Sequence, residues 1–284
     1  MISLWIIDRD ALLCHDGAPF VLMLDQAPKG AISLGFGETH QAHYEPTVPL
    51  DPLPVTHALD AQIACDLGLI FPYGDGYDGK SVQNLRTVSF RELLNLFDQS
   101  TLHIISRAIM LVQWQNDHAY CSRCGTKTIN HAQGEHAKVC PKCRHHAYPR
   151  VQPCVITAIT RTHPQTGKPQ ILLALHHRHR TNGVYGLIAG FVEVGETLEM
   201  AAKREAFEEV GVRIDQLEYI HSQPWPYPSN LMTGFIARFQ SGEIRVQAGE
   251  ISDAKFFDLD DLPSIPKAGT IAHELIQHVI ARYS

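Results

Sequence analysis

The sequence predicts an α+β protein of three units, because three kinds of pattern follow one another along the chain. Short apolar runs broken by Asp, Gly and Pro come first, and two helical segments follow them. Four closely spaced cysteines come next, and the last part joins strand-like runs to a glycine-rich loop and a capped helix. The patterns change near residues 117 and 148, so we expect units at 1–117, 118–148 and 149–284.

Composition limits the classes of protein that this chain can belong to. Its 284 residues include 24 Lys and Arg against 30 Asp and Glu, a net charge of −6, so it lacks a global positive field for non-specific nucleic-acid binding. The first residues do not resemble a secretory leader, and no apolar run approaches the ~20 residues that a membrane helix needs. We therefore expect a cytoplasmic protein with no membrane partner.

Residues 1–117 predict a small mixed α/β domain that carries no catalytic motif. Strands are expected at the apolar runs 5–7, 20–24, 31–34 and 64–71. Two helices are expected after them, one at 90–97 and one at 104–115 that leads to the cysteines. This region therefore predicts a fold but no chemistry.

The four cysteines have the spacing of a zinc ribbon. Two C-x-x-C knuckles, separated by fifteen residues, can place four thiolates around a tetrahedral ion: Cys121, Cys124, Cys140 and Cys143. Four protein ligands leave no open position on the ion, which favours one structural zinc per chain. The alternative is a nucleic-acid contact, because the segment is locally basic, with Arg123, Lys127, Lys138, Lys142 and Arg144.

The segment 190–212 predicts a short helix with three clustered acids. Thr197 suits the N-cap, where its hydroxyl accepts an amide hydrogen bond, and Gly211 suits the left-handed residue after the helix. Between them lie about 13 helical residues. An apolar stripe repeats every four residues, at Leu198, Ala202, Ala206 and Val210. Glu205, Glu208 and Glu209 fall in one arc beside it.

Such a cluster is costly unless cations balance it. Like charges at helical spacing repel, and partial burial raises the pKa of each carboxyl group. Arg204, four residues before Glu208, can offset one charge, and Mg²⁺ favours carboxylate oxygens while it keeps water and phosphate as further ligands. The alternative is a solvated acidic helix face, but a preceding loop with three glycines favours a metal–phosphate site.

The segment from Gly190 to Val212 resembles the Nudix box, G-x5-E-x7-R-E-U-x-E-E-x-G-U, where U is a bulky aliphatic residue. All polar and glycine positions match, and Ala206 departs only in being small. The resemblance implies a Nudix α/β/α sandwich with a mixed sheet for residues 149–284. It also implies hydrolysis of a nucleoside diphosphate linked to another group, with Mg²⁺ or Mn²⁺ as the catalytic metal.

A proline-rich segment after the box narrows the resemblance. Three prolines around two aromatic residues favour a rigid extended segment between strand-like runs at 219–222 and 231–239. It is either a stiff connector or a preorganised wall on which a base or nicotinamide stacks, with polar contacts from Gln223 and Tyr227. The segment is similar to S-Q-P-W-P-x-P-x-S of the zinc-ribbon NADH pyrophosphatases, with Asn230 at the last Ser position.

The resemblance also assigns roles to individual residues. It implies metal ligands at Glu205, Glu209 and Glu250 and at the backbone carbonyl of Ala189, with Glu208 close by. Either Glu208 or Glu209 takes the proton of the attacking water, and Arg204 positions the carboxylates. Substrate contacts are implied at Gln223, Pro224, Trp225, Pro226, Tyr227, Pro228, Ser229, Asn230, Tyr148, Ala272 and Arg86.

For the whole chain, the resemblance implies hydrolysis of NADH or NAD to nicotinamide mononucleotide and AMP. The same cleavage would remove a 5′-NAD cap from RNA, and the resembled enzymes are homodimers. One alternative is another Nudix substrate, such as ADP-ribose, coenzyme A or a dinucleoside polyphosphate. A second is a zinc-ribbon nucleic-acid-binding or regulatory protein whose Nudix half senses a nucleotide.

Overall fold

The computed structural model describes residues 2–15, 18–19, 21–24, 31–36, 61–66 and 85–283. They form two compact units. The first consists of Met1–Arg150 with Pro226–Ser229, and the second of Val151–Trp225 with Asn230–Ser284. The short insertion Pro226–Ser229 therefore belongs to a different unit from the residues on either side of it.

Unit 1 contains a seven-stranded sheet with the order β3-β2-β1-β6-β5, to which β4 adds beside β1 and β7 beside β2. The strands are β1 Ile2–Asp8, β2 Ala11–His15, β3 Ala18–Pro19, β4 Val21–Leu24, β5 Ile32–Phe36, β6 Ala61–Asp66 and β7 Leu85–Ser89. Among the described strands of this sheet, only β1 and β6 pair in parallel. The four expected runs lie in β1, β4, β5 and β6, while residues 20 and 67–71 are outside the described part.

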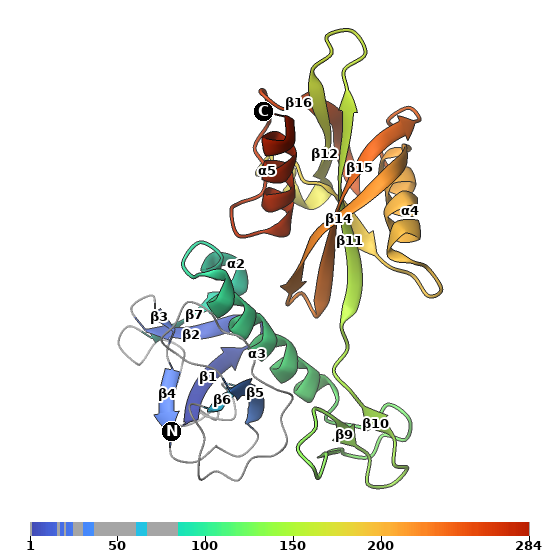
Figure 1. The fold of residues 1–284 in the computed structure, drawn as a ribbon. Helices are drawn as coiled ribbons and strands as arrows, with labels where there is room; N and C mark the ends of the chain where they lie inside the picture. Colours follow the sequence, from blue (N-terminus) through green and yellow to red (C-terminus); the bar gives the residue numbers. More distant parts are fainter. Residues whose placement is uncertain are drawn as a thin grey trace. The chain divides into compact units, whose positions relative to one another are not determined.

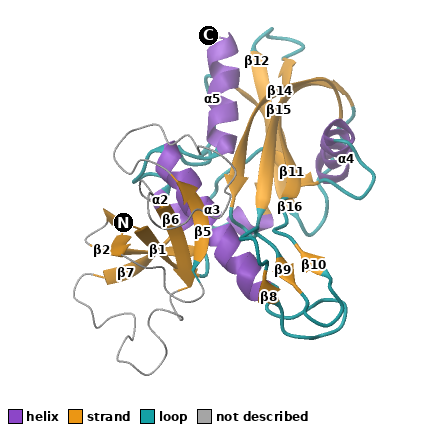
Figure 2. Ribbon diagram, turned by 60° about the horizontal axis from the view of Figure 1, so that its bottom comes forward, coloured by secondary structure: helices purple, strands orange, loops and turns teal. Residues whose placement is uncertain are grey.

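Two helices follow the sheet, α2 Phe90–Leu93 and α3 Gln99–Asp117. The first ends before residue 97 because Asp98 starts a new helix, in which its side chain accepts a hydrogen bond from Thr101 N at 2.9 Å. The second begins earlier than expected and packs on β1, β5 and β6 (Figure 2). In the described part of the chain, no helix has the length and apolar character needed to cross a membrane.

The cysteine-rich segment forms a small antiparallel sheet of three strands, in the order β10-β9-β8. Its strands are β8 Ile129–Asn130, β9 Lys138–Val139 and β10 His146–Ala147. The histidine His136 links this segment to the larger sheet of unit 1, because its Nε2 lies 2.8 Å from the carbonyl oxygen of Ser33.

Unit 2 contains a mixed six-stranded sheet with the order β14-β15-β11-β12-β16 and with β13 beside β11. Its strands are β11 Gln152–Thr162, β12 Pro169–His176, β13 Ile188–Phe191, β14 Arg213–Trp225, β15 Asn230–Ser241 and β16 Ile251–Asp258. The central pair β11 and β15 is parallel, whereas the other pairs are antiparallel. A short 3-10 helix, η1 His177–His179, follows β12.

Helices α4 Leu198–Val210 and α5 Ile271–Tyr283 cover opposite faces of this sheet (Figure 1). Alternation along β11 explains the two layers, since successive side chains of a strand point to opposite faces. Val155 and Ile159 pack with the apolar face of α4, whereas Ile156 and Ala158 pack with that of α5. The predicted α/β/α sandwich with a mixed sheet is thereby confirmed.

The end of α4 needs glycine at residue 211. Gly211 has φ +73°, in the left-handed region that other residues adopt only with strain. A Cβ there would also lie 2.9 Å from the carbonyl oxygen of Glu243. Gly167, in the loop between β11 and β12, has φ +71° but nothing within 4 Å of a Cβ. The two positions thus differ in crowding and not in backbone angle.

We expect Gly167→Ala to lower the free energy of unfolding by about 1 kcal/mol, the cost of the left-handed conformation alone. Gly211→Ala should cost at least about twice as much, because its Cβ also meets the Glu243 carbonyl. Thermal unfolding of both variants measures the difference. Equal losses would show that the contact with Glu243 yields at no cost.

Candidate active site

The caps of α4 are those expected from the sequence. The Thr197 side chain accepts a hydrogen bond from Met200 N at 3.2 Å, and Gly211 N donates to Phe207 O at 2.9 Å. The helix between them has 13 residues. Its buried side chains include Ala202, Ala206 and Val210 from the expected stripe, and Leu198 packs partly buried against the same core.

Arg204 organises the acids of this helix. Its Nε and Nη2 donate to the two carboxylate oxygens of Glu196 at 2.7 and 2.8 Å, a bidentate pair. Its Nη1 donates to Glu205 at 2.7 Å and to Glu208 at 3.0 Å. Nη2 also donates to the carbonyl of Phe191 at 2.8 Å. The guanidinium therefore joins the loop before the helix to two of the three clustered acids.

Sequence reasoning found the Arg204–Glu208 pair from its helical spacing but missed Glu196 as the main partner. Glu196 precedes the helix, so helical periodicity does not connect it to Arg204. Its fixed position in the box was the sequence feature that could have indicated this pair. It also accepts a hydrogen bond from Glu193 N at 3.0 Å. Arg204, more than any other group, lowers the pKa of Glu196 to about 2, so this carboxylate stays charged.

Gly190 is required by the side chain of Glu205. A Cβ at residue 190 would overlap the Glu205 carboxyl group, so only glycine leaves that group room against the backbone of β13. Burial raises the pKa of Glu205, and Arg204 partly opposes the shift. The first glycine of the box is therefore required because any side chain at this position would occupy the space of the Glu205 carboxyl group.

Glu209 is the most buried acid of the cluster, with 5% of its surface exposed. Burial raises its pKa to about 8, and the charges of Glu205 and Glu250 add to the rise. Arg178 and a backbone hydrogen bond with Ala189 lower it in part. Glu208 differs, since 52% of its side chain is exposed. Two neighbouring acids on one helix thus have opposite environments.

Glu250 reaches the cluster because its loop docks on the end of α4. The last carbonyls of a helix lack partners within the helix. Here Val210 O accepts from Arg245 N at 3.0 Å, and Glu209 O accepts from Gln247 N at 2.8 Å. On the other side, Glu250 O accepts from His177 N at 2.8 Å. Backbone bonds therefore bring a fourth acid, 41 residues after Glu209 in the numbering, to the helix.

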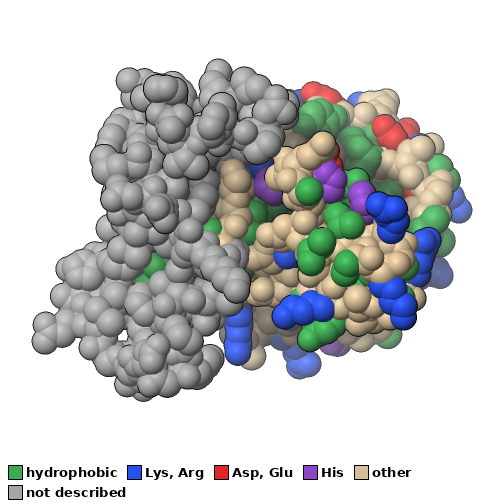
Figure 3. Space-filling model, turned by 90° about the horizontal axis from the view of Figure 1, so that it is seen from below, with side chains coloured by type: hydrophobic (Ala, Val, Ile, Leu, Met, Phe, Trp, Pro, Cys, Tyr) green, Lys and Arg blue, Asp and Glu red, His purple; other side chains and the backbone are tan. Residues whose placement is uncertain are grey.

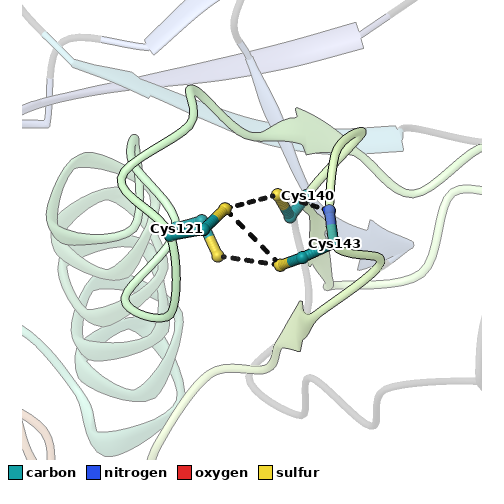
Figure 4. Close-up of side chains that lie close together, drawn as sticks. Cys121, Cys140 and Cys143 are labelled. Carbon is teal, nitrogen blue, oxygen red and sulfur yellow. Dashed lines mark hydrogen bonds between the residues drawn. The ribbon is translucent and has the colours of Figure 1, made fainter.

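The four cysteine sulfurs of the ribbon converge (Figure 4). Three Sγ–Sγ distances are 3.5 to 3.6 Å, and all four sulfurs lie within 4.8 Å of one another. A tetrahedral zinc with bonds of about 2.3 Å requires sulfurs roughly 3.8 Å apart. The quartet of Cys121, Cys124, Cys140 and Cys143 therefore fits a zinc ion closely.

The two knuckles repeat one backbone turn. Gly125 N donates to Cys121 O at 2.9 Å, and Arg144 N donates to Cys140 O at 3.0 Å. Both donors have positive φ, +70° at Gly125 and +59° at Arg144. In each turn a backbone amide also points to sulfur, Arg123 N to Cys121 and Cys143 N to Cys140, each at 3.4 Å. These amides stabilise thiolate charge.

The basic residues of the ribbon are mostly on its surface. Four of them are exposed: Arg123, Lys127, Lys142 and Arg144. Lys138 is used internally, since its Nζ donates to Asn130 Oδ1 at 2.6 Å. In the view from below, onto the end that carries β9 and β10 in Figure 1, Lys and Arg side chains gather on the coloured surface (Figure 3). This surface could attract a polyanion.

The proline-rich segment is held at its start by Gln223. This side chain is buried, its Nε2 donates to Gly269 O at 2.8 Å, and its Oε1 accepts from Ile271 N at 2.9 Å. Both ends of the amide therefore tie β14 to the beginning of α5. The substrate contact expected from the sequence for Gln223 stays a prediction, and the two hydrogen bonds show in addition that this side chain positions the segment.

The expected substrate residues are divided between the two units. Unit 2 contains Gln223, Pro224 and Trp225 at the end of β14, Asn230 at the start of β15, and Ala272 in α5. Unit 1 contains Pro226, Tyr227, Pro228 and Ser229, the exposed Tyr148, and Arg86 in β7 opposite Cys14. The side chain of Arg86 lies outside the described part of the chain.

Comparison with known proteins assigns the chain to a family. Residues 152–279 match the NUDIX domain, and residues 116–148 match the NADH pyrophosphatase zinc ribbon domain. The NAD-capped RNA hydrolase NudC of Escherichia coli, in strains SMS-3-5 / SECEC and O81 ED1a, is 42% identical over 193 residues, 68% of this chain and 72% of that protein. The chain belongs to the Nudix hydrolase family. A Nudix hydrolase structure from Nitrosomonas europaea is also similar, with 24% identity, a TM-score of 0.48, and 57% of this chain and 90% of that chain covered.

The acids of this Nudix site suit a hard divalent cation. The pKa values of Glu205 and Glu209 are both raised, mainly by burial and partly by the charge of Glu250. The charge of Glu208 adds to the rise at Glu205, and the charge of Glu205 adds to the rise at Glu209. Among the described residues, the cysteine quartet is the only such group of candidate metal ligands. At the glutamates, Mg²⁺ would keep waters and phosphate oxygens among its ligands.

The pKa of Glu209 predicts how stability changes with pH when no Mg²⁺ is added. Its folded-state pKa, about 8, is above the ordinary value of 4.5, so the folded protein holds this proton more tightly than the unfolded chain. Stability should therefore fall as the pH rises from 5 to 8.5. Glu209→Gln should reduce the fall by roughly 3 °C or more in melting temperature, whereas the exposed Glu208→Gln should not. A Glu209→Gln protein with the wild-type slope would contradict this assignment.

Zinc removal tests the ribbon. Cys140→Ser should lower bound zinc from about one ion per chain to a small fraction of that, because a tetrahedral site with three thiolates binds weakly. Metal analysis of the purified protein gives the ratio. Cys154→Ala, a buried cysteine of β11 outside the quartet, is the matched control and should keep its zinc.

Proposed function

We propose that this chain hydrolyses the diphosphate of NADH or NAD to nicotinamide mononucleotide and AMP, and that it removes NAD caps from RNA. The observation that carries the proposal is the 42% identity, over two thirds of the chain, to proteins named NAD-capped RNA hydrolase NudC. The zinc ribbon match and the proline-rich segment support the same substrate class. One cleavage serves all these substrates, because the bond that breaks is the same.

The metal-binding roles fall to two acids whose pKa is raised by burial, Glu205 and Glu209, and to the partly exposed Glu250. Glu205, Glu209 and Glu250, with the backbone carbonyl of Ala189, would hold Mg²⁺ or Mn²⁺. When bound, such a metal neutralises charge on the diphosphate and lowers the pKa of a water molecule. With the metal bound, the site would stabilise the negative charge of the substrate, which the acids alone would repel.

The remaining groups of the box position the carboxylates or accept a proton. Arg204 positions Glu205 and Glu208 through the hydrogen bonds from its Nη1. Either Glu208 or Glu209 accepts the proton of the attacking water. Exposure favours access of water to Glu208, whereas burial gives Glu209 a pKa near 8, close to working pH.

Substrate contacts and assembly complete the proposal. The nicotinamide nucleotide would meet the segment from Gln223 to Asn230 together with Tyr148, Arg86 and Ala272. Exposed basic residues of the ribbon would favour the RNA chain behind an NAD cap. We further propose three domains at 1–117, 118–148 and 149–284, a homodimer, and a cytoplasmic location, where cysteine ligands stay reduced.

The test is release of AMP from NADH, NAD, ADP-ribose and NAD-capped RNA by the purified, zinc-loaded protein with Mg²⁺ or Mn²⁺. Glu209→Gln should lower kcat/KM for NADH by on the order of a hundredfold or more, because it removes a metal ligand or the base. Glu243→Gln, an exposed acid in the loop after β15, should behave as wild type.

Two results would contradict the proposal. Wild-type turnover of NADH by a folded Glu209→Gln protein would remove the box acids from the reaction. Hydrolysis of ADP-ribose in preference to both NADH and NAD-capped RNA would place the chain with other Nudix substrates.

A further inference from the structure

The middle of the proline-rich segment has partners that the proposed reaction does not explain. Tyr227 belongs to unit 1, which includes Pro226–Ser229 together with residues 1–150. Its ring lies against α2, which contains none of the residues implied by the Nudix resemblance.

Two residues of α2 hold the Tyr227 ring. The guanidinium carbon of Arg91 lies 4.5 Å from the ring centroid, over the ring face, which is a cation–π contact. The ring of Phe90 meets it edge-on, with centroids 6.4 Å apart and planes at 63°. One contact fixes the face of the ring and the other fixes its edge.

The tyrosine hydroxyl is enclosed as well. Burial raises the pKa of Tyr227, and the negative charge of Asp10 adds to the rise. The positive charge of Arg91 acts in the opposite direction. The hydroxyl therefore lies between the turn after β1 and the start of α2. Asp10, Phe90 and Arg91 together form what we call the Tyr227 socket.

The socket is built on ordered elements. Phe90 N donates to Asp10 O at 3.1 Å, which fixes α2 on the turn between β1 and β2. Ser89 and Glu92 form a capping box, in which Ser89 N donates to the Glu92 carboxylate at 3.1 Å. Phe90 is also fully buried. A side chain seated here is held by the sheet of unit 1 and not by a loose loop.

We propose that Arg91 is a positioning residue for substrate selection, which holds Tyr227 and so keeps the proline-rich segment in its nucleotide-recognising conformation. This inference rests on the proposed function and assigns part of its substrate specificity to residues 1–117. A segment held in one conformation before binding loses less entropy when substrate arrives. The benefit should therefore appear in KM for NADH and in the choice between substrates, and not in the chemical step.

The experiment removes the charge and keeps an unbranched, flexible side chain. Arg91→Met should raise KM for NADH roughly three- to tenfold, the range expected for a partly buried cation–π contact, and leave kcat within about twofold. The ratio of kcat/KM for NADH to that for ADP-ribose should fall by a similar factor. Arg91→Lys, which restores a cation near the ring, should lie between Arg91→Met and wild type.

The matched control is Arg107→Met, the same substitution at an exposed position of α3 in unit 1, which should keep wild-type kinetics. An Arg91→Met protein with wild-type KM would overturn the inference alone. An equal loss on NADH and ADP-ribose, together with a lower melting temperature, would reduce Arg91 to a structural residue and also overturn it. Absence of NADH hydrolysis by the unsubstituted chain would instead overturn the proposed function, and this inference with it.

Discussion

The acidic site depends on one guanidinium that several acceptors share. Arg204 binds Glu196 through two hydrogen bonds and reaches Glu205, Glu208 and the Phe191 carbonyl with the rest of its donors. Carboxylates gathered around one side chain repel each other, so a shared cation both lowers the cost and fixes their directions. It does not neutralise the whole cluster: Glu209 keeps a pKa near 8, because burial outweighs the opposing charge of Arg178. The excess negative charge is what a hard divalent cation offsets.

The ends of α4 decide which other groups join this site. At the start, Gly190 leaves space for the Glu205 carboxyl group. At the end, the carbonyls of Glu209 and Val210 accept amides from the loop that carries Glu250. Neither effect depends on a polar side chain. Gly190 acts because it has no side chain, and the last carbonyls of the helix act because they have no partner within it. The helix that supplies three of the acids therefore also holds, through its last carbonyls, the loop that carries the fourth.

The proline-rich segment is held by contacts at two places along its length. Gln223 ties its first part to α5 within unit 2, and the Tyr227 socket holds its middle within unit 1. The two side chains that looked most suited to polar contact with substrate are thus engaged with the protein. Under the proposed function, these contacts would preorganise the segment for substrate, and the prolines, which restrict the backbone between them, would act in the same sense.

The sequence by itself determined the elements whose cause is local. Helix α4 has both caps and the length expected from Thr197 and Gly211, the cysteine spacing anticipated the quartet, and the order of motifs identified the family. Only the tertiary structure decided which distant groups meet. It pairs Arg204 with Glu196 across the start of a helix, docks the Glu250 loop through backbone amides, and places Tyr227 against Arg91. Helix caps and metal-ligand knuckles depend on residues a few positions apart, so their spacing can be recognised in the sequence. The other contacts join segments whose separation along the chain follows no regular spacing, so the sequence does not indicate them.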